Sequence, residues 1–266
     1  MDKNNAESWS RDKAISHLLE EHGGLVYNLG LRMCGTPENA EDLVQETFLR
    51  AFRNWEQFEG KSNPTTWLYT IASRACSRFK RRRAGEPSKM LSLSKLLPDQ
   101  TEDIPIINSE DEAPLDKILQ EEFQDAVNRA IAALPSHFRI ALMLKDVVGL
   151  SSTDVAQILG IKKATVKTRV HRARLLLRKE LAEKLPKRKA QHPDHSRQAC
   201  LDLLHAKQEA LDRGVTFPLA ESELCTRCRS LFSTLDLAKD TCLEIKNGKL
   251  PEHLRQLVLK EFGAQS

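Results

Sequence analysis

The chain has 266 residues, of which 40% are hydrophobic and 29% charged, a composition typical of globular proteins rather than disordered or fibrous ones. Its formal net charge is only +4, so any strongly charged surface must arise from local segregation of charges. The first residues lack the apolar core of a signal peptide, and no apolar run approaches the roughly 18 residues of a membrane span. We therefore expect a cytoplasmic protein, in which the six cysteines are thiols or metal ligands rather than disulfides.

Apolar residues recur at helical spacing along nearly the whole chain, so the sequence predicts an all-α fold. A first helix is expected over about 12–34. Thr36 and Pro37 then have the residue types of the N-cap and the first position of a second helix. Asn63 and Pro64 repeat this pattern at the start of a third helix.

Charges alternate in sign along the chain. The segment 74–83 carries six basic and no acidic residues, whereas 99–125 carries ten acidic residues and one lysine. The stretch 85–115 is rich in proline and acidic residues, which is typical of a linker between domains. A second helical unit is expected to begin near Asp116.

Residues 151–178 have the pattern of a short helix, a glycine turn at Gly160 and a longer basic helix, which is a helix-turn-helix. Ser151 and Asp154 resemble a capping box at its start. Nine Lys or Arg residues against two acids between 162 and 184 suit a helix that contacts the phosphates of DNA. The alternative interpretation is a solvated basic face on a structural helix pair.

Several ordered motifs resemble one known family. The segments Asp42–Phe52 and Thr66–Arg74, followed by Leu134-Pro135 ahead of the helix-turn-helix, resemble the two conserved domains of sigma-70-type bacterial transcription initiation factors. The compact extracytoplasmic-function (ECF) subgroup is the most similar, and the resemblance covers about 12–184. It implies a region 2-like domain over 12–84, a linker over 85–115 and a region 4-like domain over 116–185.

The resemblance also implies functional residues in the first domain. Asp42, Gln45 and Glu46, on the outward face of the second helix, would contact core RNA polymerase; the alternative is a solvated acidic face. The residues implied for recognition of the −10 element and for melting are Lys61, Ser62, Asn63, Trp67, Tyr69, Arg74, Arg78, Lys80 and Arg81. Aromatic side chains beside cations can replace lost base stacking, but a Trp or Tyr on a helix also commonly belongs to a core.

In the second domain, the basic helix would read the −35 element. The implied contact residues are Lys162, Lys163, Thr165, Lys167, Thr168, Arg169, His171, Arg172 and Arg174. Lys162 and Ala164 stand where the family commonly has Ser and Gly, so the usual N-cap is missing and a cation lies at the positive end of the helix dipole. In the family the acidic linker threads toward the RNA exit path; ordinary disorder is the alternative for this stretch.

The segment 190–266 lies outside the sigma pattern and faintly resembles a zinc-binding anti-sigma domain, so we expect a fused regulatory domain that acts on the sigma domains to which it is tethered. Cys200, Cys225 and Cys228 form a candidate zinc site, although Glu221 stands where that domain has a histidine. A fourth ligand would come from His195, His205 or Glu221. A helical extension with buried cysteines is the other open interpretation.

These patterns predict a transcription initiation factor, which is not an enzyme, and no motif indicates a catalytic site. The implied partners are core RNA polymerase and promoter DNA, with a separate anti-sigma factor as a further candidate and no membrane partner. No cofactor is required by this function, and zinc in the extension is the one candidate. The alternative hypothesis is a stand-alone helix-turn-helix regulator with a metal- or redox-sensing C-terminal domain.

Overall fold

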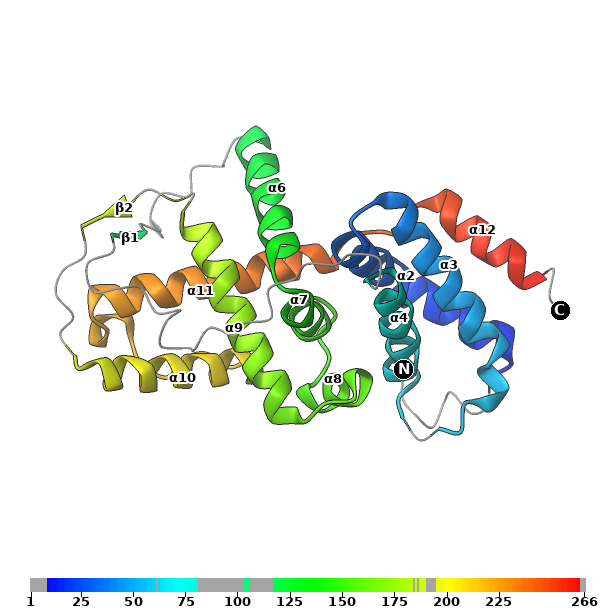
Figure 1. Ribbon diagram of the computed structural model, residues 1–266, viewed down its shortest axis with the longest axis horizontal. Coiled ribbons are helices and arrows are strands. Elements are labelled where there is room, and N and C mark those ends of the chain that lie inside the picture. The colour runs from blue at the N-terminus through cyan, green and yellow to red at the C-terminus, as the bar shows by residue number, and fades with distance from the viewer. Residues whose placement is uncertain are drawn as a thin grey trace. The chain divides into compact units, whose positions relative to one another are not determined.

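The computed structural model describes residues 9–60, 62–80, 103–105, 117–183, 185, 187–189 and 195–263 (Figure 1). The chain forms two compact units. One combines 1–86, 139–166 and 243–266, and the other combines 87–138 and 167–242. Each unit therefore contains segments that are distant in sequence.

The first unit is built on three helices, α2 (Arg11–Cys34), α3 (Pro37–Arg53) and α4 (Pro64–Lys80), with a 3-10 turn η1 (Trp55–Gln57) after α3. The predicted cap of α3 is confirmed, because Thr36 Oγ1 accepts a hydrogen bond from the Asn39 amide at 3.3 Å. The α2–α3 pair packs closely where Gly30 meets Ala40. A Cβ at Gly30 would lie 2.8 Å from the Ala40 Cα, so a glycine is required there.

The same unit contains the start of the helix-turn-helix. Helix α7 (Ser136–Leu142) continues into a π-helical turn η2 (Met143–Val147), and α8 (Ser152–Leu159) follows. The Ser151 hydroxyl accepts a hydrogen bond from the Asp154 amide at 3.1 Å, which confirms the predicted start of α8. Asp154 also accepts from the Thr66 hydroxyl of α4 at 3.3 Å, so α8 is packed against α4.

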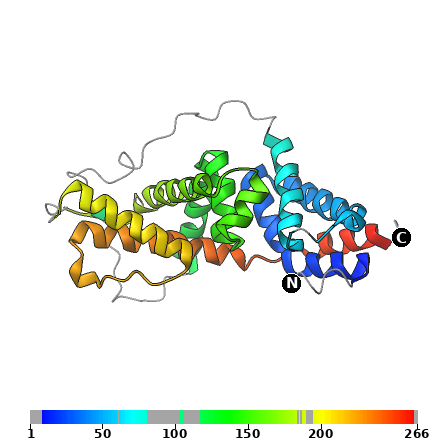
Figure 2. The same cartoon turned by 90° about the horizontal axis from the view of Figure 1, so that it is seen from below.

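The last helix, α12 (Glu252–Gly263), returns to the N-terminal helices and runs along α2 and α3, as both views show (Figures 1 and 2). Its buried residues Leu254, Val258 and Phe262 recur every four positions and form one apolar stripe. Helix α12 is thus part of the core of the first unit.

The second unit contains α6 (Lys117–Ala133), most of α9 (Lys163–Ala182), α10 (Arg197–Arg213), the turn η3 (Glu221–Glu223) and most of α11 (Thr226–Lys246). Leucines of α9, α10 and α11 form its core together with Cys225, Cys228 and Phe232. A short antiparallel pair joins β1 (Ile104–Pro105) to β2 (Lys187–Arg188).

The all-α prediction is confirmed, with this strand pair as its one departure among the described residues. Of the predicted linker 85–115, only 103–105 are described; Asp103 is exposed, whereas Ile104 and Pro105 are buried and anchored. The Pro105 carbonyl accepts a hydrogen bond from the buried Ser230 hydroxyl of α11 at 2.7 Å. None of the described helices has both the length and the apolarity needed to cross a membrane.

Candidate nucleic-acid interface

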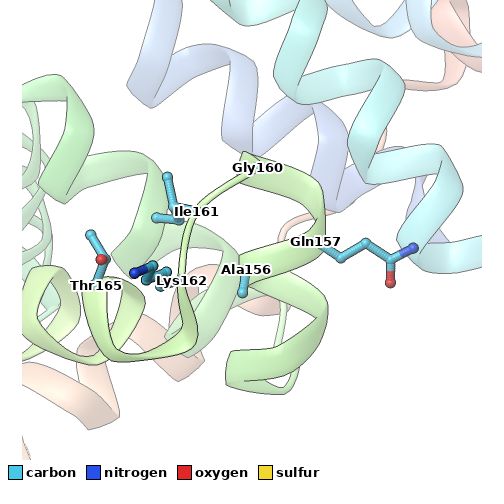
Figure 3. Close-up of a pocket in the computed structure, with 6 residues that line it drawn as sticks. All are labelled: Ala156, Gln157, Gly160, Ile161, Lys162 and Thr165. Carbon is cyan, nitrogen blue, oxygen red and sulfur yellow. The ribbon is translucent and has the colours of Figure 1, made fainter.

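The turn of the helix-turn-helix has the predicted geometry. Gly160 ends α8 in the left-handed conformation with φ of 65°, and its amide donates to the last carbonyls of α8. Beyond the turn, Lys162 and Thr165 lie side by side at the start of α9, while Gln157 of α8 points the other way (Figure 3). These residues line an open hollow of about 650 Å³ at the outer surface of the turn.

The nine residues predicted to contact the −35 element fall into two groups along α9. Lys162 and Lys163 are exposed, and Thr165, Thr168, Arg169 and Arg172 are partly exposed. The other three residues, Lys167, His171 and Arg174, face α10 of the C-terminal segment. His171 and Arg174 are buried there.

Beside the shared leucine core, α9 and α10 are joined by short polar contacts. Lys167 Nζ donates to both carboxylate oxygens of Glu209 at 2.7 Å. Arg174 Nη1 donates to Asp212 Oδ1 at 2.8 Å, and His171 Nε2 lies 2.9 Å from Asp212 Oδ2. Because an ionised carboxylate only accepts hydrogen bonds, the His171 ring is the donor in this pair.

Gln208 completes this network. Its amide oxygen accepts from Arg174 Nη1 at 3.1 Å, and its amide nitrogen donates to the His171 carbonyl at 3.3 Å. Burial alone would raise the pKa of Asp212. The hydrogen bond from His171 and the charge of Arg174 outweigh that effect, and the pKa of Asp212 lies below its ordinary value. Asp212 is therefore an ionised carboxylate.

The predicted melting segment lies at the start of α4. Asn63 Oδ1 accepts from the Thr65 amide at 2.9 Å, so this side chain caps the helix. Trp67 is partly exposed and packs in an aromatic cluster, with ring centroids 5.8 Å from Trp55 and 5.4 Å from Phe58. Arg74 is exposed and Ser62 partly exposed.

The expectation that Tyr69 lies at the surface, where it could engage a base of the −10 element, was wrong. Tyr69 is fully buried in the core of the first unit, edge-on to His22 at 5.7 Å, and burial raises the pKa of its hydroxyl. It follows Leu68 on the inner face of α4 and is not a surface platform for a base. Lys61 and Arg81 lie outside the described residues, and Arg78 and Lys80 are described only as part of the α4 backbone.

The predicted polymerase-binding residues lie on the outward face of α3. Asp42 is exposed, Gln45 and Glu46 are partly exposed, and Glu46 pairs with Arg50 at 3.0 Å one turn later. This places acceptor-rich side chains together on one exposed stretch of helix.

The predicted zinc ligands also come together. Cys225 and Cys228 belong to one buried cluster against which Cys200 packs, and burial together with the two neighbouring thiols raises the pKa of Cys228. Cys200 lies on α10, whereas Cys225 and Cys228 lie at the start of α11. His195 and His205 are exposed. No disulfide joins any of the six cysteines, all of which lie among the described residues.

Comparisons with known proteins assign the family. Residues 18–86 match Sigma-70 region 2 and residues 124–177 match Sigma-70 region 4. The ECF RNA polymerase sigma factor SigW of Bacillus subtilis is 31% identical over 170 residues, which cover 64% of this chain and 90% of SigW. The ECF RNA polymerase sigma-E factor of Haemophilus influenzae is 30% identical over 171 residues, covering 64% of this chain and 88% of that protein.

The chain belongs to the ECF sigma factors of the sigma-70 family. It is therefore a transcription initiation factor, and the stand-alone regulator is not favoured, because region 2 accounts for the N-terminal helices. Among solved structures, the sigma factor RpoE of Bartonella quintana, crystallised with the anti-sigma factor NepR, is 26% identical. The match covers 62% of this chain and 94% of RpoE, with a TM-score of 0.45.

Within this sigma factor, sequence reasoning missed the residues that meet the basic helix. Gln208, Glu209 and Asp212 of α10 were not predicted as site residues, because short acidic patches on helices are usually solvated. One sequence feature could have indicated this pairing. Glu209 and Asp212 lie one helical turn apart, as do Lys167 and His171 of α9. Their pairing is a tertiary contact and could not be read from either helix alone.

Proposed function

We propose that this sigma factor binds core RNA polymerase through the exposed face of α3 and directs it to promoters with two DNA-binding surfaces. The observation that carries the proposal is the presence of both sigma regions, with Asp42 and Arg74 exposed in the first and Lys162 and Lys163 exposed in the second. It acts by binding alone, without covalent catalysis. It acts in the cytoplasm, where the polymerase is. A separate anti-sigma factor is a further proposed partner.

In this proposal α9 reads the −35 element and the start of α4 engages the −10 element. The exposed Lys162 and Lys163 would hold phosphates, and Arg169 and Arg172 would reach base edges or phosphates from the major groove. Trp67 is the remaining aromatic candidate for the edge of the melted region, with Arg74 positioned for the DNA backbone.

The polymerase contact is tested by pulling down core polymerase with the full-length protein. Asp42→Ala with Glu46→Ala is expected to abolish both co-purification and transcription while the helicity stays unchanged. Glu38→Ala with Glu56→Ala removes two exposed acids of the same unit and serves as the matched control. Co-purification of the first variant at the wild-type level would show that the assigned face of α3 is wrong.

The DNA assignments are separated by transcription and permanganate footprinting on a pool of promoters. Arg169→Ala should weaken promoter engagement by about 1–3 kcal/mol if it contacts a specific base. Trp67→Ala should leave the closed complex largely intact and reduce permanganate reactivity around −10. Unchanged reactivity would return Trp67 to a purely structural role in the cluster with Trp55 and Phe58.

We also propose that Cys200, Cys225 and Cys228 bind zinc. Three thiols in one core cluster support this, Cys200 from the first turn of α10 and the other two from the start of α11, since thiolates are preferred zinc ligands. Bound zinc would supply a crosslink between the two helices. Elemental analysis of the full-length protein should find about one zinc per chain. Cys225→Ser with Cys228→Ser should lose it and Cys242→Ala, at another buried cysteine, should keep it; zinc-free wild-type protein would exclude the site.

A further inference from the structure

The basic residues of α9 that face the C-terminal segment lie in one stripe. Lys167, His171, Arg174 and Arg178 are spaced by four, three and four residues, which places them on the same side of the helix. Each of them meets a polar group of the C-terminal segment, and for Arg178 this is the Thr234 hydroxyl of α11 at 3.2 Å. The segment therefore covers this stripe of α9, the recognition helix of the helix-turn-helix.

Two carboxylates lie at the centre of this cover, and they differ in burial. The Asp212 side chain is 4% exposed and Arg174 is 1% exposed, whereas Glu209 and Lys167 are 46% and 33% exposed. Burying an ion is unfavourable unless charged partners and hydrogen bonds replace its water. Asp212 has both, because His171 and Arg174 each approach a different oxygen.

The arrangement reproduces the way a basic helix holds a phosphate. Phosphate is tetrahedral and carboxylate is planar, but both are anions whose oxygens accept charge-assisted hydrogen bonds from basic side chains. Glu209 and Asp212 lie one helical turn apart and neutralise cations that are also one or two turns apart on α9. In a DNA complex, consecutive phosphates would need those same donors.

A metal ion is the competing occupant of this cluster. Ligand atoms of His171, Glu209 and Asp212 lie within 4.8 Å of one another. Lys167 Nζ already contacts both Glu209 oxygens, and Arg174 contacts Asp212. Two positive charges at the carboxylates oppose the entry of a further cation, so the geometry favours the internal ion pairs.

We propose that α10 is a built-in phosphate mimic, which uses Glu209 and Asp212 to hold Lys167, His171 and Arg174 of the recognition helix in competition with DNA. The proposal rests on the proposed reading of DNA by α9. Because α10 follows α9 in the same chain, its local concentration is on the order of millimolar, and even weak pairing keeps the basic stripe covered. Contact of DNA with Lys167, His171 and Arg174 then requires that α10 leave α9.

Such competition lowers the apparent affinity for DNA by the fraction of molecules in which α9 is uncovered. Fluorescence anisotropy with a labelled duplex of about 30 base pairs measures this in the full-length protein, over a series of salt concentrations. Glu209→Gln with Asp212→Asn should bind the duplex about 10-fold more tightly than its control. The slope of log affinity against log salt should steepen by about 2 as two cations become available to phosphates.

The matched control is Glu244→Gln with Glu252→Gln, which makes the same change in net charge at exposed carboxylates of the same segment. It corrects for the general attraction of a more positive protein to DNA. A second variant, Glu209→Lys, keeps the buried Asp212 contacts and should show a gain of about threefold. This variant tests the proposal even where Asp212→Asn perturbs folding.

The outcomes separate the mimic from the function on which it rests. If Arg169→Ala leaves duplex binding unchanged, α9 is not a DNA-reading helix and the proposed function fails. If Arg169→Ala weakens binding while Glu209→Gln with Asp212→Asn and Glu209→Lys both match the control, α9 reads DNA and the phosphate mimic is wrong.

Discussion

The C-terminal segment meets the two sigma regions through contacts that differ in chemistry. Helix α10 contacts α9 through ion pairs, the innermost of them buried, beside the leucine core that the two helices share, whereas α12 contacts α2 and α3 mainly through apolar and backbone surfaces. Phe262 stacks on Phe52 with ring centroids 4.8 Å apart, and the ion pairs of α12, from His253 and Arg255, lie at its exposed edge. The segment before α12 fits closely against α2, where a Cβ at Gly24 would come 2.3 Å from the Gly248 carbonyl oxygen.

This difference determines what can open each contact. A polyanion can replace the carboxylates of α10, because it offers the same kind of acceptor to the same cations. It offers nothing to Phe52 or to the backbone near Gly24. We therefore expect the α10 contact to respond to DNA and salt and the α12 contact to respond mainly to changes in shape.

The largest effect is expected where a buried ion loses its partner. Arg174→Ala leaves Asp212 buried with His171 as its remaining partner in the pair, and should lower the free energy of unfolding by about 3 kcal/mol. Urea denaturation followed by circular dichroism measures this. Lys163→Ala, an exposed cation on the same helix, should change stability by less than about 0.5 kcal/mol. Equal effects of the two substitutions would show that the buried pairing does not stabilise the α10 contact.

A somewhat smaller loss is expected at the apolar contact. Phe262→Ala removes the ring that stacks on Phe52 and should cost about 2 kcal/mol, below the range for a central core position because it lies in the last turn of α12. Leu257→Ala on the same helix, 41% exposed, is the control and should cost little. Because this contact is apolar, we expect the loss to be the same at low and high salt, and strong salt dependence would contradict the comparison.

Acid should weaken the two contacts unequally. The pKa of Asp212 is held below its ordinary value of 3.8 by His171 and Arg174 of α9, with Glu209 and Lys167 nearby. A carboxyl whose pKa is lower in the folded state stabilises the fold fully when the pH is above its unfolded-state pKa. This stabilisation is lost as the pH falls through its folded-state pKa. The stability difference between the wild type and Asp212→Asn should therefore shrink as the pH falls below about 4. A difference that is constant from pH 5 to pH 2 would contradict this assignment.

The smallest effect is expected at the exposed rim of α12. Arg255 lies 3.4 Å from Glu20, and both side chains are well exposed. Such pairs contribute little, so Arg255→Ala should change the free energy of unfolding by less than about 0.5 kcal/mol. A cost above 1 kcal/mol would mean that the α12 contact is also electrostatic, and the contrast with α10 would disappear.

Local signals predicted the helices well. The Thr36–Pro37 start of α3, the Ser151 cap of α8 and the turn at Gly160 are determined by residues within a few positions of one another, and all three were confirmed. The strand pair of β1 with β2 escaped prediction, because two residues on each side carry no alternation pattern and pair across a large sequence separation.

The candidate sites show the same division. The faces of α3 and α9 follow from helical periodicity, so the positions of Asp42, Lys162 and Lys163 could be predicted. Tyr69 was misplaced because its residue type fits both a core and a base platform, and only packing against His22 decides between them. The burial of Arg174 depends on α10, more than thirty residues later in the chain, and no local pattern records that contact.

The return of the C-terminal segment to α2 also bears on how the protein is made. The Asn28 side chain donates to the Ile245 carbonyl across 217 positions of sequence, and Gly24 meets Gly248 across a similar span. On the ribosome, the N-terminal helices therefore emerge long before the residues that cover them. Contacts of such high sequence separation form late, so a nascent chain exposes this face of α2 throughout most of its synthesis. During that time this face of α2 is exposed in a way that it is not in the finished chain.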